Sequence, residues 1–232
     1  MPFEQTFHPQ YRDAEPDGLV GLKGAMHYFQ DIHTWFMHSI HKGNDEIPEK
    51  YGSAWVYTRY LVSLSQKIDY TDQITLQAWM EPYRQPVLVN VNMLLHQHGR
   101  VAAMGKIENC VFSLERQRPQ RLSAIEFPES IPEEIPNSIP DFIQLEKTAE
   151  GMEEKYIRTV RYSDLDKSNH MTTCGILICS RIPTIRLSGI TSSQNRWRYA
   201  FCHNPGKVKR SLFAAGRKGM LSIWLQSMRM IA

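Results

Sequence analysis

The stretch LKGAMHYFQDIHTWFMHSIHKG, residues Leu22–Gly43, decides the fold class. Its apolar residues recur at the spacing of a helix, so one face is apolar. These residues are Leu22, Ala25, Met26, Phe29, Ile32, Phe36 and Ile40. Gly43 is a typical helix stop. The pattern predicts one helix of about 20 residues, roughly 30 Å long, which needs an apolar partner for that face.

Four runs with strand character follow the helix. Each is rich in aromatic and β-branched residues or alternates apolar with polar ones. They span 54–68, 73–83, 86–97 and 101–115. Short polar turns join them, which favours antiparallel neighbours. A shorter run, EQTFHPQY, precedes the helix and suits one more strand. One long helix followed by a meander of strands predicts an α+β fold in which an antiparallel sheet wraps the helix.

Three motifs around this helix resemble one known family. They are YRDAEPDG before the helix, HSIHKG at its end and AWVYTR at the start of the next strand. Their order is similar to that in the N-terminal half of bacterial acyl-carrier-protein (ACP) thioesterases, and the resemblance covers residues 1 to about 171. It implies a tandem hot-dog fold, in which each domain is a long helix wrapped by an antiparallel sheet.

The chain divides into four expected parts. Residues 1–118 are expected to form the N-terminal hot-dog domain. Residues 119–150 are expected to form an extended linker, because prolines remove hydrogen bonds from strands and helices; they lie at 119, 128, 132, 136 and 140. Residues 151–172 repeat the strand and Tyr-x-Asp turn of the N-terminus, so they begin a second hot dog. That second hot dog is expected to be incomplete, because residues 173–232 lose the pattern.

The segment SDLDKSNHM resembles the catalytic turn of the family, Asp-x-Asn-x-His before a helix. Asp166 fits the Asp and His170 fits the His. Ser168 stands at the Asn position, with Asn169 one residue later, so either could hold the water or the carbonyl. The resemblance implies that His170 activates a water and that Asp166 orients it. Without the resemblance, a helix-capping turn explains the same residue types, and this alternative stays open.

The first domain also offers candidates for an acyl-binding groove. Met26, Phe29, Trp35 and Trp55 could supply its apolar wall, although any core or pocket needs such residues. Histidines on the helix invite a metal site; they are His27, His33, His38 and His41. No carboxylate completes a recognisable ligand set. We therefore expect these histidines at the surface or lining the groove, with no metal and no cofactor.

The charges of the chain are divided unevenly. Residues 172–232 carry ten Lys and Arg but none of the 24 Asp and Glu. The codons of Thr173–Arg181 can be read one base earlier as Asn-Leu-Arg-Tyr-Ile-Asp-Met-Phe-Gln. This string is similar to the continuation of the family motif and has helical spacing. We therefore predict that one base is missing around codon 172 or 173, and that residues 173–232 are a frameshifted tail.

A basic tail can also bind nucleic acid or a membrane. No zinc finger, aromatic-basic RNA motif or basic amphipathic helix supports such a partner. No run of 18 apolar residues predicts a transmembrane helix, and the first residues do not resemble a secretory signal. We therefore expect a cytoplasmic protein without a nucleic-acid or membrane partner.

The resemblance implies a hydrolase of fatty acid biosynthesis. It would cleave fatty acyl-ACP thioesters to free fatty acids, with ACP and a fatty acyl chain as partners; a homodimer is also compatible. The chain as written would be inactive if the frameshift is real. Two further alternatives are a non-catalytic hot-dog module that binds acyl thioesters and an acyl-CoA thioesterase.

Overall fold

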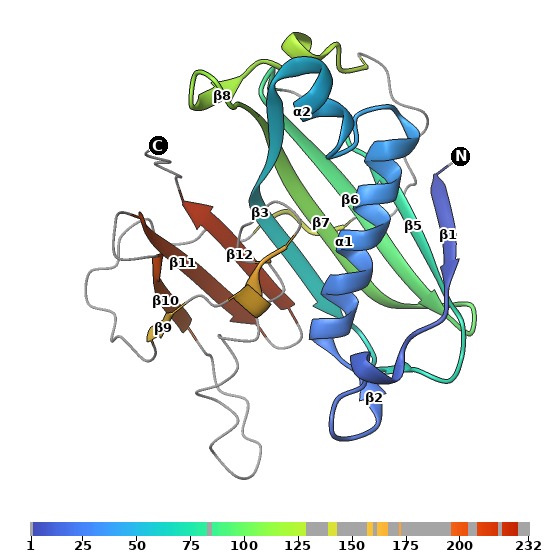
Figure 1. Cartoon of the computed structure of the whole chain (residues 1–232). Coiled ribbons are helices and arrows are strands. Elements are labelled where there is room, and N and C mark those ends of the chain that lie inside the picture. Colours follow the sequence, from blue (N-terminus) through green and yellow to red (C-terminus); the bar gives the residue numbers. More distant parts are fainter. Residues whose placement is uncertain are drawn as a thin grey trace. The chain divides into compact units, whose positions relative to one another are not determined.

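The computed structural model describes residues 2–82, 85–128, 139–142, 157–159, 162–166, 172, 196–203, 208–217 and 220–226. The chain forms two compact units. Unit 1 is Met1–Phe142 and unit 2 is Ile143–Ala232 (Figure 1). Among the described residues, no helix is both long and apolar enough to span a membrane.

The long helix of unit 1, α1 (Leu22–Ser39), begins at the predicted residue. It ends before the predicted stop at Gly43. His41 adopts a left-handed backbone with a φ of 56°, and the N–H of Lys42 donates to the carbonyl of Met37 at 2.9 Å. A helix typically ends where a residue adopts the left-handed conformation and the N–H of the next residue bonds to the carbonyl five residues before it. The spacing therefore predicted the helix, whereas local backbone geometry sets its end.

A second, short helix was not predicted. Residues between the predicted helix and the first predicted strand form α2 (Glu46–Tyr51). Its first turn contains Pro48, whose missing N–H costs nothing there, and buries Ile47 completely. Gly52, with a φ of 58°, ends it. Gly52 is a typical helix stop, so the sequence did signal the end of α2. With only six residues, the helix was too short to be predicted from the spacing of its apolar residues.

The main sheet of unit 1 contains six strands. They are β1 (Phe3–Phe7), β3 (Ser53–Leu64), β5 (Ile74–Met80), β6 (Leu88–Gln97), β7 (Arg100–Ser113) and β8 (Arg118–Gln120). The order β1-β5-β6-β7-β3 is antiparallel throughout, and β8 pairs with the end of β7 beyond β6. A separate ribbon joins β2 (Leu19–Val20) to β4 (Ile68–Asp69). The strands predicted from alternation are confirmed.

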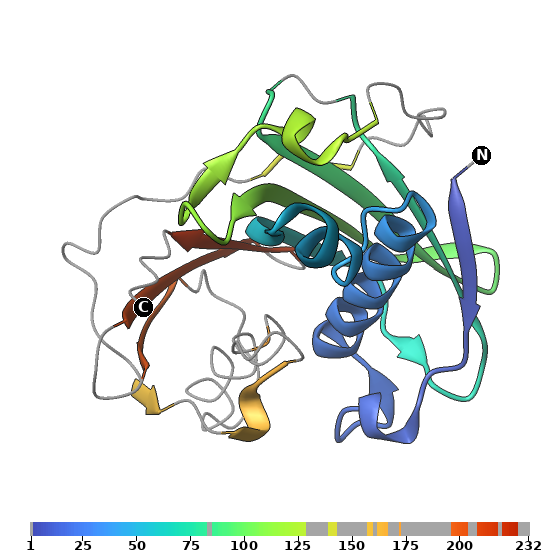
Figure 2. The ribbon, with the colours of Figure 1, turned by 45° about the horizontal axis from the view of Figure 1, so that its top comes forward.

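The sheet of unit 1 curves over α1 (Figure 2). The core lies between them, and Met26 and Phe29 of α1 are fully buried. Phe29 packs directly over Gly105 of β7, where an added Cβ would lie 2.7 Å from the ring carbon Cδ2. Gly105 therefore permits a close approach between helix and sheet that any larger side chain would obstruct. The predicted α+β architecture of a helix wrapped by an antiparallel sheet is confirmed.

The described part of unit 2 consists of four strands and a 3₁₀ turn, η3 (Tyr162–Asp164). The strands are β9 (Ile157–Thr159), β10 (Arg196–His203), β11 (Val208–Arg217) and β12 (Met220–Gln226). β10, β11 and β12 form an antiparallel meander, and β9 pairs with β10 in parallel. The tail thus has more strand order than its sequence led us to expect. The reading frame and the domain boundaries at 118, 150 and 172 stay predictions.

Candidate active site

The candidate catalytic residues lie in or after the η3 turn of unit 2. The N–H of Leu165 donates to the carbonyl of Tyr162 at 3.1 Å, and the N–H of Thr172 donates to the carbonyl of Asp164 at 3.0 Å. These bonds hold residues 164 and 172 together. Asp166 is half-buried inside this loop. The other candidates belong to the same stretch of sequence but lie outside the described residues; they are Ser168, Asn169 and His170.

Unit 1 contains the same turn, η1 (Tyr11–Asp13). The N–H of Ala14 donates to the carbonyl of Tyr11 at 3.2 Å, as Leu165 does to Tyr162. Ala14 and Leu165 each form an isolated β-bridge, and both first tyrosines are exposed. Residues 11–14 therefore correspond to residues 162–165, and the internal repeat indicated by Tyr-x-Asp is present in the backbone.

The first turn is fixed to α1 through Asp13. The hydroxyl of Tyr28 donates to Asp13 Oδ2 at 2.6 Å. Burial, together with this bond, raises the pKa of Tyr28, so the phenol keeps its proton. The Asp13 carboxylate also accepts from the backbone N–H of Gln10 at 3.1 Å. The acid at the third position of this turn therefore has a structural role.

Glu15 takes the place in unit 1 that Asp166 takes in unit 2. Its Oε2 lies 3.2 Å from Lys67 Nζ, and Lys67 also pairs with Asp17. The Glu15 carboxylate lies beside Gly21, the residue that precedes α1, where an added Cβ would collide with it. The first turn thus places a carboxylate at the start of a long helix and neutralises it with a lysine. Sequence reasoning missed this cluster, because Lys67 is distant along the chain.

The two turns differ at the position four residues after this acid. Unit 2 has His170 there, whereas unit 1 has Leu19. A carboxylate with a nearby imidazole provides a general base and the group that orients it. Of the two turns, only the second has both an acid and a histidine at these two positions of the sequence.

The four candidates for the wall of the acyl groove differ in burial. Met26 and Phe29 lie together on the buried face of α1, and the carbonyl of Met26 accepts from Tyr60 Oη at 3.0 Å. Trp55 is half-buried, and its Nε1 donates to the carbonyl of Lys42 at 2.8 Å. Trp35 is 50% exposed and therefore does not belong to the core. Trp35 is not among the residues at helical spacing on the apolar face. It was chosen for its residue type, and Trp suits both a core and a surface site.

The helix histidines also differ in environment. His33 is buried, with Nδ1 3.0 Å from the hydroxyl of Tyr57. Burial lowers the pKa of His33 to about 3, so its ring is neutral at physiological pH. His38 and His41 are exposed, with Nδ1 atoms 3.9 and 3.6 Å from the Glu46 carboxylate. Within the described part of the chain, no three His, Cys, Asp or Glu residues form a metal-binding group.

Comparison with known protein families decides which family this is. The model of the acyl-ACP thioesterase N-terminal domain matches residues 1–125. The chain belongs to the acyl-ACP thioesterase family. Members of this family hydrolyse fatty acyl-ACP thioesters, so this protein is a thioester hydrolase whose substrate is an acyl chain joined to its carrier protein.

Solved structures are similar over nearly the whole chain. The 12:0-ACP thioesterase from Umbellularia californica has a TM-score of 0.63 at 14% identity, covering 96% of this chain and 95% of that one. A putative oleoyl thioesterase from Lactobacillus plantarum gives 0.64 at 12%, covering 97% and 95%. An acyl-ACP thioesterase from Bacteroides thetaiotaomicron VPI-5482 gives 0.56 at 13%, covering 96% of each chain. These likenesses show the hot-dog fold. A comparison with curated proteins found no match.

Proposed function

We propose that this acyl-ACP thioesterase cleaves its substrate in unit 2 with Asp166 and His170, and holds the acyl chain in unit 1. The observation that supports this division is the repeated turn. Both copies carry an acid at the equivalent position, Glu15 and Asp166, but Glu15 pairs with Lys67 and has no histidine four residues later. We therefore assign catalysis to the second turn, in unit 2.

The proposed reaction is a direct hydrolysis. His170 takes a proton from a water while the water oxygen attacks the thioester carbon, and Asp166 orients the imidazole or the water. The carbonyl oxygen carries the negative charge of the tetrahedral intermediate, which hydrogen-bond donors stabilise. The carbon–sulfur bond then breaks, and the leaving sulfur takes the proton from His170. Ser168 or Asn169 would hold the water or the carbonyl. The products are a free fatty acid and the carrier thiol.

The acyl chain would lie against the apolar side of α1 in unit 1. Met26 and Phe29 give this face its apolar character, and both are buried in the core between α1 and the sheet. Trp55 would contribute to the wall, since its indole N–H is already bonded to Lys42 and its ring packs edge-on to Phe127. Trp35 is half-exposed and is not included.

We also propose the domain organisation predicted above. Residues 1–118 form the first hot dog, 119–150 the linker and 151–172 the start of the second, and 173–232 are read out of frame. The repeat supports this frame. Adding the same 151 residues that relate the turns to positions 25, 26 and 29 gives 176, 177 and 180. With suitable synonymous codons, the neighbouring frame can encode Tyr, Ile and Phe at these three positions, then Gln-Asp. Phe29 is likewise followed by Gln-Asp, whereas the written chain has Ser180.

We propose that the enzyme works in the cytoplasm, with neither nucleic acid nor a membrane as partner. A homodimer is the assembly to test, by sedimentation of the purified protein.

The catalytic proposal is tested by replacing His170 in the frame-restored protein. His170→Ala should reduce release of the carrier thiol from a long-chain acyl-ACP by roughly 10²- to 10⁴-fold, the usual contribution of a general base. His8→Ala, at an exposed position of unit 1, is the matched control and should retain full activity. Unchanged turnover in His170→Ala would refute the assignment.

A further inference from the structure

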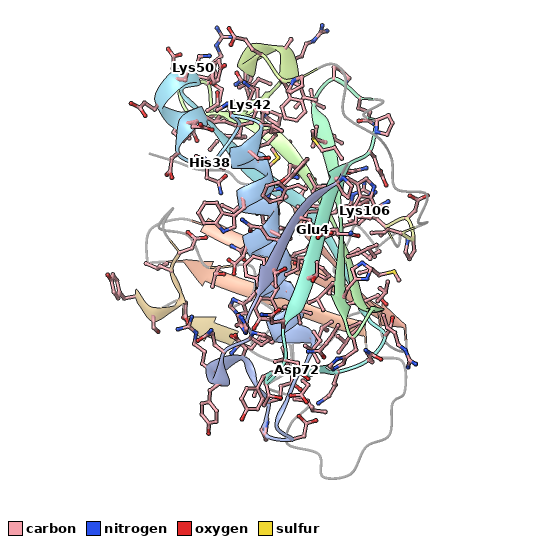
Figure 3. The ribbon with its side chains drawn as sticks, turned by 90° about the vertical axis from the view of Figure 1, so that its right-hand side faces the viewer. Glu4, His38, Lys42, Lys50, Asp72 and Lys106 are labelled. Carbon is pink, nitrogen blue, oxygen red and sulfur yellow. The ribbon has the colours of Figure 1, made fainter. Side chains whose placement is uncertain are left out.

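The face of the unit 1 sheet opposite to α1 carries a cluster of charged and polar side chains. Gly105 faces the helix, where it contacts Phe29. Because successive side chains of a strand point to opposite faces, the next residue, Lys106, points to the other side. Figure 3 shows Lys106 on the side of the sheet away from α1. Its side chain is only 1% exposed, which is unusual for a lysine.

Lys106 of β7 is held by a carboxylate that directly follows β5, with β6 between the two strands. Its Nζ lies 2.6 Å from Glu81 Oε1. Burial acts to raise the pKa of Glu81, but hydrogen bonds from Lys106, Asn92 and Asn90 outweigh it and lower the pKa. Both amide donors lie 3.0 Å from the carboxylate oxygens. The Lys106 charge is therefore fixed in position and already neutralised.

A second cation beside it is arranged in the same way. Arg59 donates from Nε to Glu108 Oε1 at 2.8 Å, and its terminal nitrogen also pairs with Oε2. Thr58 Oγ1 donates to Glu108 Oε1 at 2.5 Å. The Glu108 side chain is 6% exposed. Two cations, each paired with its own carboxylate, thus lie on neighbouring strands β3 and β7.

One aromatic ring covers both cations. The Phe142 centroid lies 4.3 Å from Arg59 Cζ and 5.8 Å from Lys106 Nζ. Both distances are within the roughly 6 Å range of cation–π attraction. Two positions earlier than Asp141, Ile139 is buried. Asp141 Oδ1 lies 3.5 Å from Lys106 Nζ, but the Asp141 side chain is fully exposed.

We propose that Arg59 and Lys106 form a socket for Phe142, and that this contact anchors the linker to the sheet of unit 1. A neutral ring suits the socket better than an anion does, because Glu81 and Glu108 already balance its charge. The ion pair of Asp141 is exposed to water and screened by salt, so it contributes little. Phe142 is therefore the main element of the anchor.

The anchor has a defined place in the chain. Phe142 is the last residue of unit 1, and the chain of unit 2 starts at Ile143. Fixing Phe142 fixes the point from which the second unit leaves the sheet. This inference does not depend on the identity of the catalytic residues, so it can fail or succeed independently of the proposed function.

Limited proteolysis of the full chain tests the anchor. A glutamate-specific protease has target residues on both sides of it, at positions 129, 133, 134, 146, 150, 153 and 154. Phe142→Ala should accelerate cleavage at these sites by roughly 2- to 30-fold, the range that corresponds to loss of a cation–π contact. Mass spectrometry of the fragments identifies the sites and also shows whether cleavage inside unit 1 stays slow.

Two conservative variants separate an aromatic socket from an apolar one. Phe142→Trp keeps a ring over the cations and should be cleaved at the unmodified rate, whereas Phe142→Leu keeps apolar bulk without the ring and should be cleaved faster. Asp141→Asn should change the rate by less than about twofold. Tyr11→Ala, at an exposed aromatic residue elsewhere in unit 1, is the control. Equal rates for the Trp and Leu variants, or no acceleration in Phe142→Ala, would overturn the proposal.

Discussion

The turns at Tyr11–Asp13 and Tyr162–Asp164 have the same hydrogen bond but lead into different sequences. The first leads into α1, whose buried residues recur at helical spacing. The second leads into residues that lose this spacing and all acids. In a tandem fold the same turn should lead into the same kind of helix. The difference is what the proposed frameshift after the second turn predicts.

The strands formed by residues 196–226 are compatible with the proposed frameshift. Segments such as RWRYAFCH and MLSIWLQ are rich in aromatic and apolar residues, which suit a pleated surface. A strand can therefore form from many sequences that are rich in such residues. A helix that packs on a sheet requires apolar residues at fixed spacing, and a shifted frame destroys that spacing first.

The largest expected effect comes from restoring the frame. One base inserted near codon 173 should give a well-expressed, active thioesterase, whereas we expect the written chain to express poorly and to lack measurable activity. We expect an out-of-frame tail to leave its apolar segments without matched partners, and exposed apolar patches and strand edges favour aggregation. Purification and a long-chain acyl-ACP assay compare the two. Insertion of three bases at the same place keeps the written frame and is the matched control. A written chain that is monodisperse and equally active would show that the tail is a genuine domain.

Unit 1 offers the next largest effect, on stability. Phe29→Ala removes a fully buried ring from between α1 and β7, and should lower the free energy of unfolding by about 3–5 kcal/mol. Trp35→Ala, on the same helix but half-exposed, should cost clearly less. Chemical denaturation of both variants measures the difference. Equal losses would show that α1 does not bury the face assigned to it.

A smaller effect concerns the pH dependence of unit 1. The pKa of Glu81 is lowered in the folded state, so its contribution to stability is present above the unfolded pKa, near 4.5. That contribution is lost as the pH falls through the lower folded value. Glu81→Gln should therefore be less stable than the unmodified protein at neutral pH, by about 1–3 kcal/mol, because Lys106 loses its carboxylate.

The difference between these two proteins should shrink as the pH falls below 4.5. Thermal unfolding at several pH values measures it. A constant difference between pH 3 and 7 would contradict the assigned role of Glu81.

The spacing of apolar residues predicted the long helix and the strands that depend on local sequence. The helix α1 and the strands β3, β5, β6 and β7 were read from the spacing of their apolar residues. Alternation did not show that Glu81, Asn92 and Lys106 lie together, because the order of the strands in the sheet brings them into contact.

The candidate site shows the same limit. Asp166 and His170 came from a motif, since both lie within a few residues of each other. The neutralised counterpart in unit 1 was missed, because Glu15 and Lys67 are separated by the whole of α1, α2 and β3. Contacts between distant parts of the chain depend on the fold as a whole, which single-sequence patterns do not specify.

The smallest expected effect tests whether the first turn is only structural. Lys67→Met removes the partner of Glu15 and Asp17. The lysine and Asp17 are substantially exposed, so the thermal midpoint should fall slightly at low salt. In about 1 M salt the drop should vanish, because the screening length shrinks to about 3 Å. Lys50→Met, which removes another exposed ion pair, with Glu126, should behave alike. Neither variant should change hydrolysis by the frame-restored protein, because Leu19 stands where a base would be needed. A specific loss of hydrolysis in Lys67→Met would show that the first turn takes part in the reaction, and the functional contrast between the two turns would then be wrong.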